Sequence, residues 1–179
     1  MTTGHVLQIG QEDTLDQFIT EMVGVFSDVY RVLRDAGTLW LNVGETIDRA
    51  DATMLGVPWR LALALAATGW KLQSEIIWSK SRYFPAGGSR RPIRTHEQLF
   101  LFSKVRDYFY DADAIREPYA EGTVERYKSD VKKVRSRATG DTSRRRIAVN
   151  VLGRHRSTVW HVAPTSTRAD GNPYATIPE

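Results

Sequence analysis

The chain has 179 residues, of which 41% are hydrophobic and 10% aromatic, and these values are typical of a globular protein rather than a disordered one. It contains no cysteine, which excludes disulfide bonds, cysteine zinc ligands and a cysteine nucleophile. No apolar run is long enough to span a membrane and the first residues lack a signal-peptide pattern, so we expect a cytoplasmic protein. The net charge of +4 favours a polyanionic partner only weakly.

The first predicted element is an amphipathic helix over residues 14–35, because apolar residues recur there at helical spacing. Thr14, followed three residues later by Gln17, forms the capping-box pattern that begins a helix. Gly37 stands where a glycine helix stop belongs. The sequence therefore predicts both ends of this helix.

The later elements alternate between strand and helix patterns. Short or alternating apolar runs predict strands, and the second helix begins at a proline that suits a first helical turn. The predicted elements are a strand over 38–43, a helix over 58–69, a strand over 70–78, a loop over 79–94 and a strand over 97–103. This order is that of an α/β protein, and the last two strands should form an antiparallel hairpin.

The segment 119–157 differs in composition from the rest of the chain. It is rich in basic residues and in Ser, Thr and Gly, and it has few large apolar side chains. We interpret it as a poorly ordered insertion with a short helix near 124–134. A strand-like run over 157–162 follows it.

Taken in order, these segments resemble the DNA methyltransferases that modify N4 of cytosine or N6 of adenine. Within that family they resemble the permuted class, in which the catalytic motif precedes the cofactor motif. No single stretch is specific, and the resemblance depends on the order and spacing of all of them. The matching stretches are 8–12, 37–44, 57–60, 69–70, 76–80, 91–92, 95–97, 110–118, 157–160 and 175–179.

The resemblance implies an α/β fold, an incomplete doubly wound Rossmann-like methyltransferase sheet with a basic insertion. Residues 1–118 would be a portion of the catalytic domain, 119–156 an insertion that resembles a target-recognition segment, and 157–179 the return to the sheet. The family binds S-adenosylmethionine at the carboxyl ends of the strands. It flips the target base out of double-stranded DNA, and the exocyclic amino group attacks the methyl sulfonium directly.

Two motifs of the family have no counterpart in this sequence. The catalytic Asp, Asn or Ser followed by Pro-Pro-Tyr would lie upstream of Gln8, and the chain contains no Pro-Pro pair. The cofactor loop Phe-x-Gly-x-Gly would lie downstream of Glu179. We therefore expect the central part of a methyltransferase, inactive alone, with a companion polypeptide as one source of the missing motifs.

The resemblance also assigns candidate site residues. The catalytic residues are unknown because their motif is absent, and no metal site is expected, since His96 and Glu97 lack a third ligand at suitable spacing. The base-pocket candidates are Trp78, Lys80, Asn42 and Glu45; the DNA-binding candidates are Arg82, Arg90, Arg91, Arg94, Arg144, Arg145 and Arg146; the cofactor candidates are Thr176 and Pro178.

Two other functions stay open at this point. The first is a non-catalytic DNA-binding remnant or accessory subunit, which the missing motifs favour. The second is a small-molecule or RNA methyltransferase with the same sheet, against which the stretches 91–97 and 111–116 argue by resemblance alone. The sequence does not distinguish adenine from cytosine as the target. It also leaves open the recognition sequence, the oligomeric state and a companion restriction enzyme.

Overall fold

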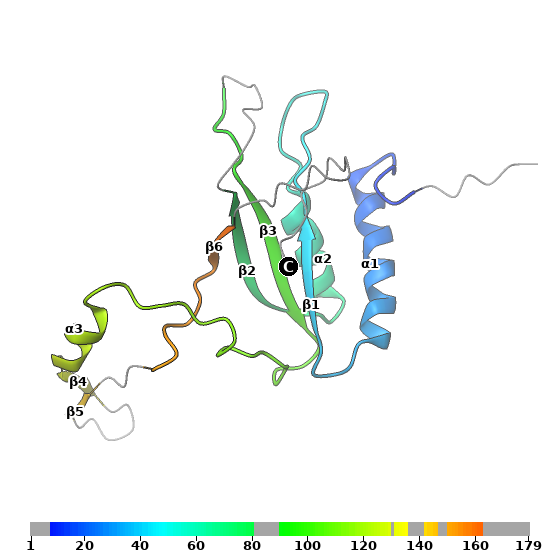
Figure 1. The fold of residues 1–179 in the computed structure, drawn as a ribbon. Helices are drawn as coiled ribbons and strands as arrows, with labels where there is room; N and C mark the ends of the chain where they lie inside the picture. The colour runs from blue at the N-terminus through cyan, green and yellow to red at the C-terminus, as the bar shows by residue number, and fades with distance from the viewer. Residues whose placement is uncertain (1–7, 81–89, 130, 136–141, 147–149, 163–179) are drawn as a thin grey trace, which may run out of the picture. The chain divides into compact units, whose positions relative to one another are not determined.

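The structure is a computed structural model that describes residues 8–80, 90–129, 131–135, 142–146 and 150–162. The chain divides into two compact units, Met1–Phe109 with Thr158–Glu179, and Tyr110–Ser157. Figure 1 shows the first as a sheet with two long helices and the second as a short helix with a two-stranded ribbon. Each unit is described separately below.

Helix α1, Leu15–Val32, confirms the first predicted element. The Thr14 hydroxyl accepts a hydrogen bond from the Gln17 backbone N–H at 3.2 Å, and Gln17 Oε1 accepts one from the Thr14 N–H at 3.1 Å. The glycine stop was wrong, because the helix already ends at Val32 and the next residue is extended. Gly37 instead belongs to the following turn, where a Cβ would lie 2.8 Å from the Leu33 side chain.

The first unit contains a four-stranded sheet in the order β1-β3-β2-β6. Its strands are β1 Thr38–Val43, β2 Lys71–Lys80, β3 His96–Ser103 and β6 Val159–Val162. Strand β3 is antiparallel to both neighbours, which confirms the predicted hairpin, and β6 is parallel to β2. The carboxyl ends of β1 and β2 therefore lie at the same edge of the sheet, on either side of the start of β3.

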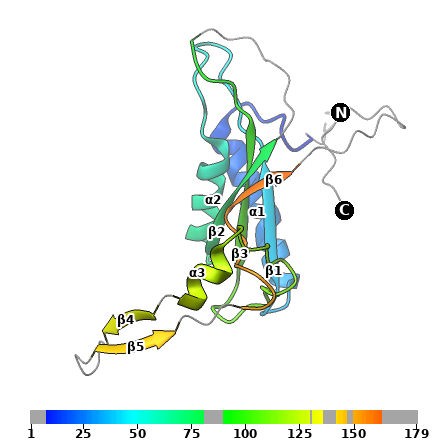
Figure 2. The same cartoon turned by 60° about the vertical axis from the view of Figure 1, so that its left-hand side comes forward.

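One face of this sheet packs against α1 and α2 (Figures 1 and 2), and α2 spans Val57–Ala67 with Pro58 in its first turn as predicted. Strand residues that alternate toward the helices form the core with apolar residues of α2. The buried core residues are Leu41, Leu61, Ala62, Leu65, Trp70, Phe100 and Phe102. Leu41 of β1 and Phe100 and Phe102 of β3 therefore point toward the helices, and the residues between them point to the other face.

The opposite face of the sheet carries a second set of apolar side chains. Ile76, Trp78 and Leu101 are buried there, at 4%, 7% and 3% exposure. Trp40 is 39% exposed, and its ring lies 6.0 Å from that of Trp160 on β6. By register Trp160 lies beside Trp78, so both sheet faces are lined by large apolar residues.

The second unit contains α3, Thr123–Ser129, and the antiparallel strands β4, Val131–Arg135, and β5, Thr142–Arg146. The predicted helix near 124–134 was therefore only half right, because its second part is a strand. Val131 and Val134 explain the change, since β-branched side chains favour extended backbone.

The base of the second unit joins residues 111–117 to residues 150–156. Glu117 and Arg154 exchange backbone hydrogen bonds at 3.0 and 2.9 Å, and Arg154 Nη2 lies 2.7 Å from Glu117 Oε2. Gly153 has a φ of +110°, and a Cβ there would meet the Glu117 carbonyl oxygen at 2.3 Å, so only glycine fits. Contacts thus group Tyr110–Ser157 together, whereas the predicted boundaries lie at 118/119 and 156/157. Those boundaries stay predictions.

Candidate functional site

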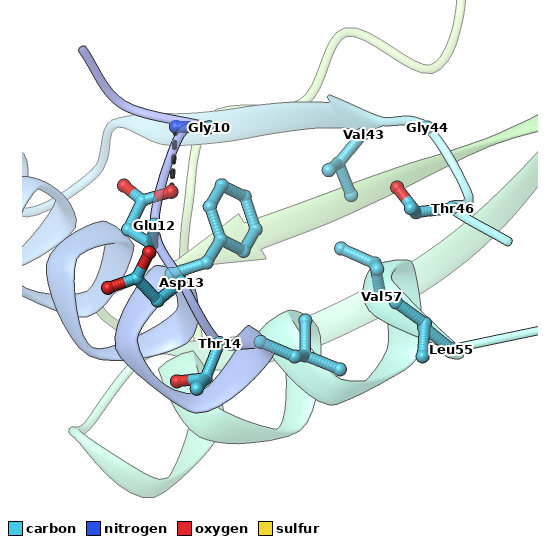
Figure 3. A pocket seen from close by; sticks show the side chains of 11 residues that line it. Gly10, Glu12, Asp13, Thr14, Val43, Gly44, Thr46, Leu55 and Val57 are labelled. Atoms are coloured by element: carbon cyan, nitrogen blue, oxygen red, sulfur yellow. Dashed lines mark hydrogen bonds between the residues drawn. The ribbon is translucent and has the colours of Figure 1, made fainter. Parts of the chain in front are cut away.

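A cavity of about 280 Å³ lies where β1 ends, between the segment that precedes α1 and the start of α2 (Figure 3). Its position follows from the topology, because the chain leaves the sheet at Gly44 and re-enters helical structure at Val57. The residues that line it are Gly10, Glu12, Asp13, Thr14, Leu15, Phe18, Val43, Gly44, Thr46, Leu55 and Val57.

The walls of the cavity differ in chemistry. Figure 3 shows the carboxylates of Glu12 and Asp13 on one side and Val43, Leu55 and Val57 on the other. The Gly10 N–H donates to Glu12 Oε2 at 2.8 Å, which holds the turn before α1 against this carboxylate. A cavity that is lined by both carboxylates and apolar side chains suits a ligand with a flat apolar body and a positive charge.

Glu45 stands in the chain between the lining residues Gly44 and Thr46, and its side chain is only 5% exposed. Its Oε1 accepts hydrogen bonds from the backbone N–H groups of Thr46 at 3.0 Å and of Val57 at 3.1 Å. Gly56, the N-cap residue of α2, has no side chain to cap the helix, so the Glu45 carboxylate takes that role from twelve residues away. Glu45, predicted in the base pocket, thus joins the end of β1 to the start of α2.

The three described arginines of the loop before β3 lie in different surroundings. Arg94 Nη1 lies 3.6 Å from Glu45 Oε2, and its other nitrogens donate to the His96 carbonyl at 3.2 Å and to Gln98 Oε1 at 3.1 Å. Arg91 donates to the Ala52 carbonyl at 2.8 Å. Arg90 is exposed, and its side chain forms no hydrogen bond or ion pair with another described residue. DNA contact by each of the three stays a prediction.

The loop that Arg91 reaches is held by its own hydrogen bonds. Ala52 adopts a φ of +60°, which an alanine rarely does, and is the only non-glycine residue in the described part of the chain to do so. The neighbouring Asp51 carboxylate accepts from the Thr53 hydroxyl at 2.6 Å and the Thr53 N–H at 2.9 Å. These hydrogen bonds, the hydroxyl first, lower the pKa of Asp51.

The other base-pocket candidates lie on the sheet face away from the helices. Asn42 is exposed and donates to the Gln98 carbonyl at 3.2 Å. Lys80 forms an ion pair with Glu97, and Trp78 lies in register with Glu97. Strand alternation therefore brings these three to the same edge as Glu45 but on the opposite face. Stacking of Trp78 on a base stays a prediction, and its ring is packed in the sheet at 7% exposure.

Strand β5 contains the predicted DNA-binding residues Arg144, Arg145 and Arg146. The backbone register places Arg144 opposite Lys133 and Arg145 opposite Lys132. Neither β4 nor β5 contains an acidic residue. Both strands therefore bring only basic charged residues to the ribbon, a composition that favours an anionic partner.

Some predicted site residues lie outside the described residues, namely Arg82, Thr176 and Pro178. Within the described part of the chain, no group of three or more acidic or histidine side chains could hold a metal ion. His96 and Glu97 are consecutive strand residues and so face opposite sides of the sheet. Among the described helices, none combines the length and hydropathy that a membrane crossing needs.

Sequence reasoning did not find the acidic side of the cavity. Glu12 and Asp13 precede the capping box of α1, and in the sequence they look like ordinary acidic residues at a helix start. The only indication in the sequence was their position just before a predicted helix start, and acidic residues are common there. Their partners in the cavity, such as Val43 and Val57, are more than 25 residues away in the chain.

Comparison with known proteins relates the chain to DNA-modifying enzymes. It is 36% identical over 150 residues to the Type II methyltransferase M.SmaI of Serratia marcescens, which covers 69% of this chain and 51% of the relative. It is 38% identical over 149 residues to M.XycI of Xanthomonas campestris pv. cyanopsidis, with 68% and 50% covered. The chain therefore spans about half the length of these relatives.

The fold and the family model agree with these relatives. The PvuII DNA methyltransferase (cytosine-N4-specific) superposes with a TM-score of 0.60 at 11% identity, over 92% of this chain and 49% of that one. The likeness shows that the sheet and helices adopt a Rossmann-like methyltransferase fold. The family model described as DNA methylase, of the N6/N4 type, matches residues 4–178. The chain therefore belongs to the N6/N4 family of DNA methylases.

Proposed function

We propose that the chain is part of an S-adenosylmethionine-dependent methyltransferase that acts on the N4 amino group of cytosine or the N6 amino group of adenine in double-stranded DNA. The match of the DNA methylase family model to residues 4–178 carries this proposal. The curated relatives are Type II methyltransferases, which supports a role in restriction and modification. Because the chain spans about half the length of each relative, the proposal concerns the whole enzyme of which this chain is a part.

We propose the cavity at the end of β1 as part of the cofactor site. S-adenosylmethionine carries a sulfonium and an ammonium cation beside a flat adenine ring, and when bound it supplies an activated methyl group. The carboxylates of Glu12 and Asp13 would attract the cations, and Val43, Leu55 and Val57 would pack against an apolar surface. The volume of about 280 Å³ lies just below the range of roughly 300–1,000 Å³ for ligand pockets, as expected for a part of a site. Thr176 and Pro178 remain proposed contacts on the strength of the resemblance.

We propose that DNA meets the basic ribbon of β4 and β5 and, in the first unit, Arg90. Both strands of the ribbon contain only basic charged residues, and such a concentration of positive charge favours binding to phosphate groups. A two-stranded ribbon is also one of the elements that the DNA major groove admits. The base-pocket roles of Asn42, Trp78 and Lys80 stay part of the proposal.

We propose that methyl transfer requires a segment or companion polypeptide that carries Pro-Pro-Tyr. The 179 residues contain no Pro-Pro pair, although the resemblance assigns the grip on the target amino group to that motif. Residues of this chain would position cofactor and DNA, and the hydrogen-bond acceptors for the amino group would come from the other segment.

The test mixes this chain with a polypeptide that carries the Pro-Pro-Tyr and Phe-x-Gly-x-Gly motifs, encoded next to this reading frame. Duplex DNA and methyl-labelled S-adenosylmethionine are added, and the digested nucleosides are separated by mass spectrometry. We expect labelled N4-methylcytosine or N6-methyladenine only when both polypeptides are present. The matched control is a companion in which the two prolines are replaced by alanine.

The same experiment separates the alternative function. If DNA binds to the chain but no mixture transfers a methyl group, the chain is a non-catalytic DNA-binding remnant or accessory subunit. Label that appears on RNA or on a small molecule in place of DNA would contradict the proposed substrate. The identity of the methylated nucleoside decides between cytosine and adenine.

A further inference from the structure

The cavity wall is held by a polar network that begins at Glu45. The Glu45 carboxylate accepts hydrogen bonds from the amides of Thr46 and Val57, and both residues line the cavity. One carboxylate thus ties the end of β1 to the first residue of α2. If this carboxylate moved, the Thr46 and Val57 amides would lose the acceptor that they share.

Arg94 continues this network across the sheet. Its Nη1 lies 3.6 Å from Glu45 Oε2, its Nη2 donates to Gln98 Oε1 at 3.1 Å, and its Nε donates to the His96 carbonyl at 3.2 Å. Gln98 in turn donates to Glu75 Oε1 at 3.0 Å on strand β2. The network therefore runs from the cavity wall through β3 to β2.

The geometry leaves this arginine poorly suited to DNA. All three nitrogens of the Arg94 guanidinium face partners inside the protein, and its side chain is only 31% exposed. Glu45 is 5% exposed, so its charge depends on a nearby cation much more than a solvated carboxylate would. Arg90, four residues earlier, is exposed and has no comparable set of partners among the described residues.

We propose that Arg94 is a positioning residue that acts through Glu45 on the cavity wall, and that it does not serve as a DNA phosphate contact. The guanidinium fixes the orientation of the Glu45 carboxylate, and the carboxylate fixes the amides of Thr46 and Val57. This proposal rests on the proposed function only in assigning the cavity to S-adenosylmethionine.

The first test measures amide hydrogen exchange in the full chain, which needs neither cofactor nor DNA. In Arg94→Gln we expect the Thr46 and Val57 amides to exchange about five- to tenfold faster, because their acceptor is no longer held. The core amides of Phe100 and Phe102 serve as the internal reference. Arg106→Gln, which removes an exposed cation elsewhere, should leave all four amides unchanged.

A double-mutant cycle then tests the route through Glu45. Glu45→Gln keeps the oxygen that accepts from Thr46 and Val57 but removes the charge that Arg94 faces. In this background Arg94→Gln should speed the exchange of the two amides less than it does in the original chain. Additive effects would overturn the route through Glu45.

Two binding measurements separate this proposal from the function it rests on. Equilibrium dialysis with S-adenosylmethionine should give a Kd about three- to tenfold weaker for Arg94→Gln than for Arg106→Gln. The slope of log DNA affinity against log salt should stay unchanged in Arg94→Gln and fall by about 0.9 in Arg90→Gln. If the original chain binds no S-adenosylmethionine, the cofactor assignment fails while the exchange measurement still decides the positioning role.

Unchanged exchange at Thr46 and Val57 in a folded Arg94→Gln overturns the proposal, whatever the salt slope. A fallen salt slope in that variant also overturns it, since Arg94 would then contact phosphate. If Arg94→Gln does not fold, Arg94→Lys replaces it, because lysine keeps the cation and loses the forked donation to Gln98. A smaller rise in exchange of the same two amides supports the proposal, and none overturns it.

Discussion

The sheet unit and the basic ribbon of β4 and β5 differ in whether acidic residues accompany their basic ones. Beside the sheet, Lys80 pairs with Glu97, Arg94 with Glu45 and Lys104 with Asp35. The strands of the ribbon contain only basic charges and place lysines opposite arginines. A cluster of arginines in the sequence therefore does not by itself identify a DNA contact. We propose that the acidic partners available in the fold decide which cations meet phosphate.

The base of the second unit repeats the first pattern within the basic region. Arg116 Nε lies 2.6 Å from Asp113 Oδ1, and Arg154 and Arg156 both face Glu117. These cations hold the base together, so within the second unit we expect the DNA-binding charge to be confined to β4 and β5.

Gly153→Ala should disrupt the base of the second unit most strongly. The added Cβ would meet the Glu117 carbonyl oxygen at 2.3 Å at a positive φ, and we expect a loss of roughly 3 kcal/mol in local stability. Amide exchange at Glu117 and Arg154 measures it. Gly122→Ala is the control, because its φ of +72° is also positive but no atom lies within 4 Å of the added Cβ. Equal effects at both glycines would refute the steric explanation.

The double variant Arg144→Gln with Arg146→Gln should weaken DNA binding next most strongly. If each arginine meets one phosphate, the slope of log affinity against log salt falls by about 1.8, twice the value for one contact. Fluorescence anisotropy with a labelled duplex over a salt series measures the slope. Arg31→Gln on α1 should leave it unaltered, since that exposed side chain pairs with Asp28. An unchanged slope in the double variant would exclude the ribbon as a phosphate contact.

Trp78→Phe should have a smaller effect, on stability. Its ring is 7% exposed, so the smaller phenylalanine leaves unfilled space, and we expect a loss of about 1–2 kcal/mol in the free energy of unfolding. Trp40→Phe, at a position 39% exposed, should cost less. Urea unfolding compares the two. A stability loss that is no larger for Trp78 would argue against its packing role and favour its availability for base stacking.

The smallest expected effect concerns Asp51 in the loop after β1. The Thr53 hydroxyl and N–H donate to its carboxylate and lower its pKa, so the ionised form is favoured in the folded loop. The resulting stabilisation is present above the pKa of an unfolded aspartate, about 3.9, and is lost as the pH falls through the lower folded value. Carboxyl NMR titration of the original chain and of Thr53→Val checks this. A pKa that does not rise in Thr53→Val contradicts the stated cause.

Local patterns in the sequence predicted most of the sheet unit. The capping box of Thr14 and Gln17, the apolar run 38–43 and Pro58 act over a few residues, so their signals can be read from the chain directly. The hairpin of β2 and β3 followed from the same patterns. Gly37 was wrongly predicted to end the helix, because glycine is favoured both at a helix end and in a tight turn. The close approach of the Leu33 side chain shows that the turn is the reason here.

The polar contacts of the site were beyond sequence reasoning. Glu45 and Arg94 are far apart in the chain, and no periodicity relates a carboxylate after one strand to an arginine before another. The sequence placed Glu45 just after the strand that is β1, but its role as a pocket residue stays a prediction, and its hydrogen bond to Val57 depends on how α2 packs. In the ribbon, isolated valines among basic residues gave a weak strand signal, and the expected helix extended into β4.

The most direct test of the central claim is an NMR titration of the chain with S-adenosylmethionine, followed on the backbone amides. We expect saturable shift changes concentrated at the cavity, on the amides of Thr14, Val43, Thr46 and Val57. The amides near Trp40 on the opposite sheet face should stay in place. Changes confined to that opposite face, or none at the cavity when the ligand is bound, would contradict the assignment of the cavity to the cofactor.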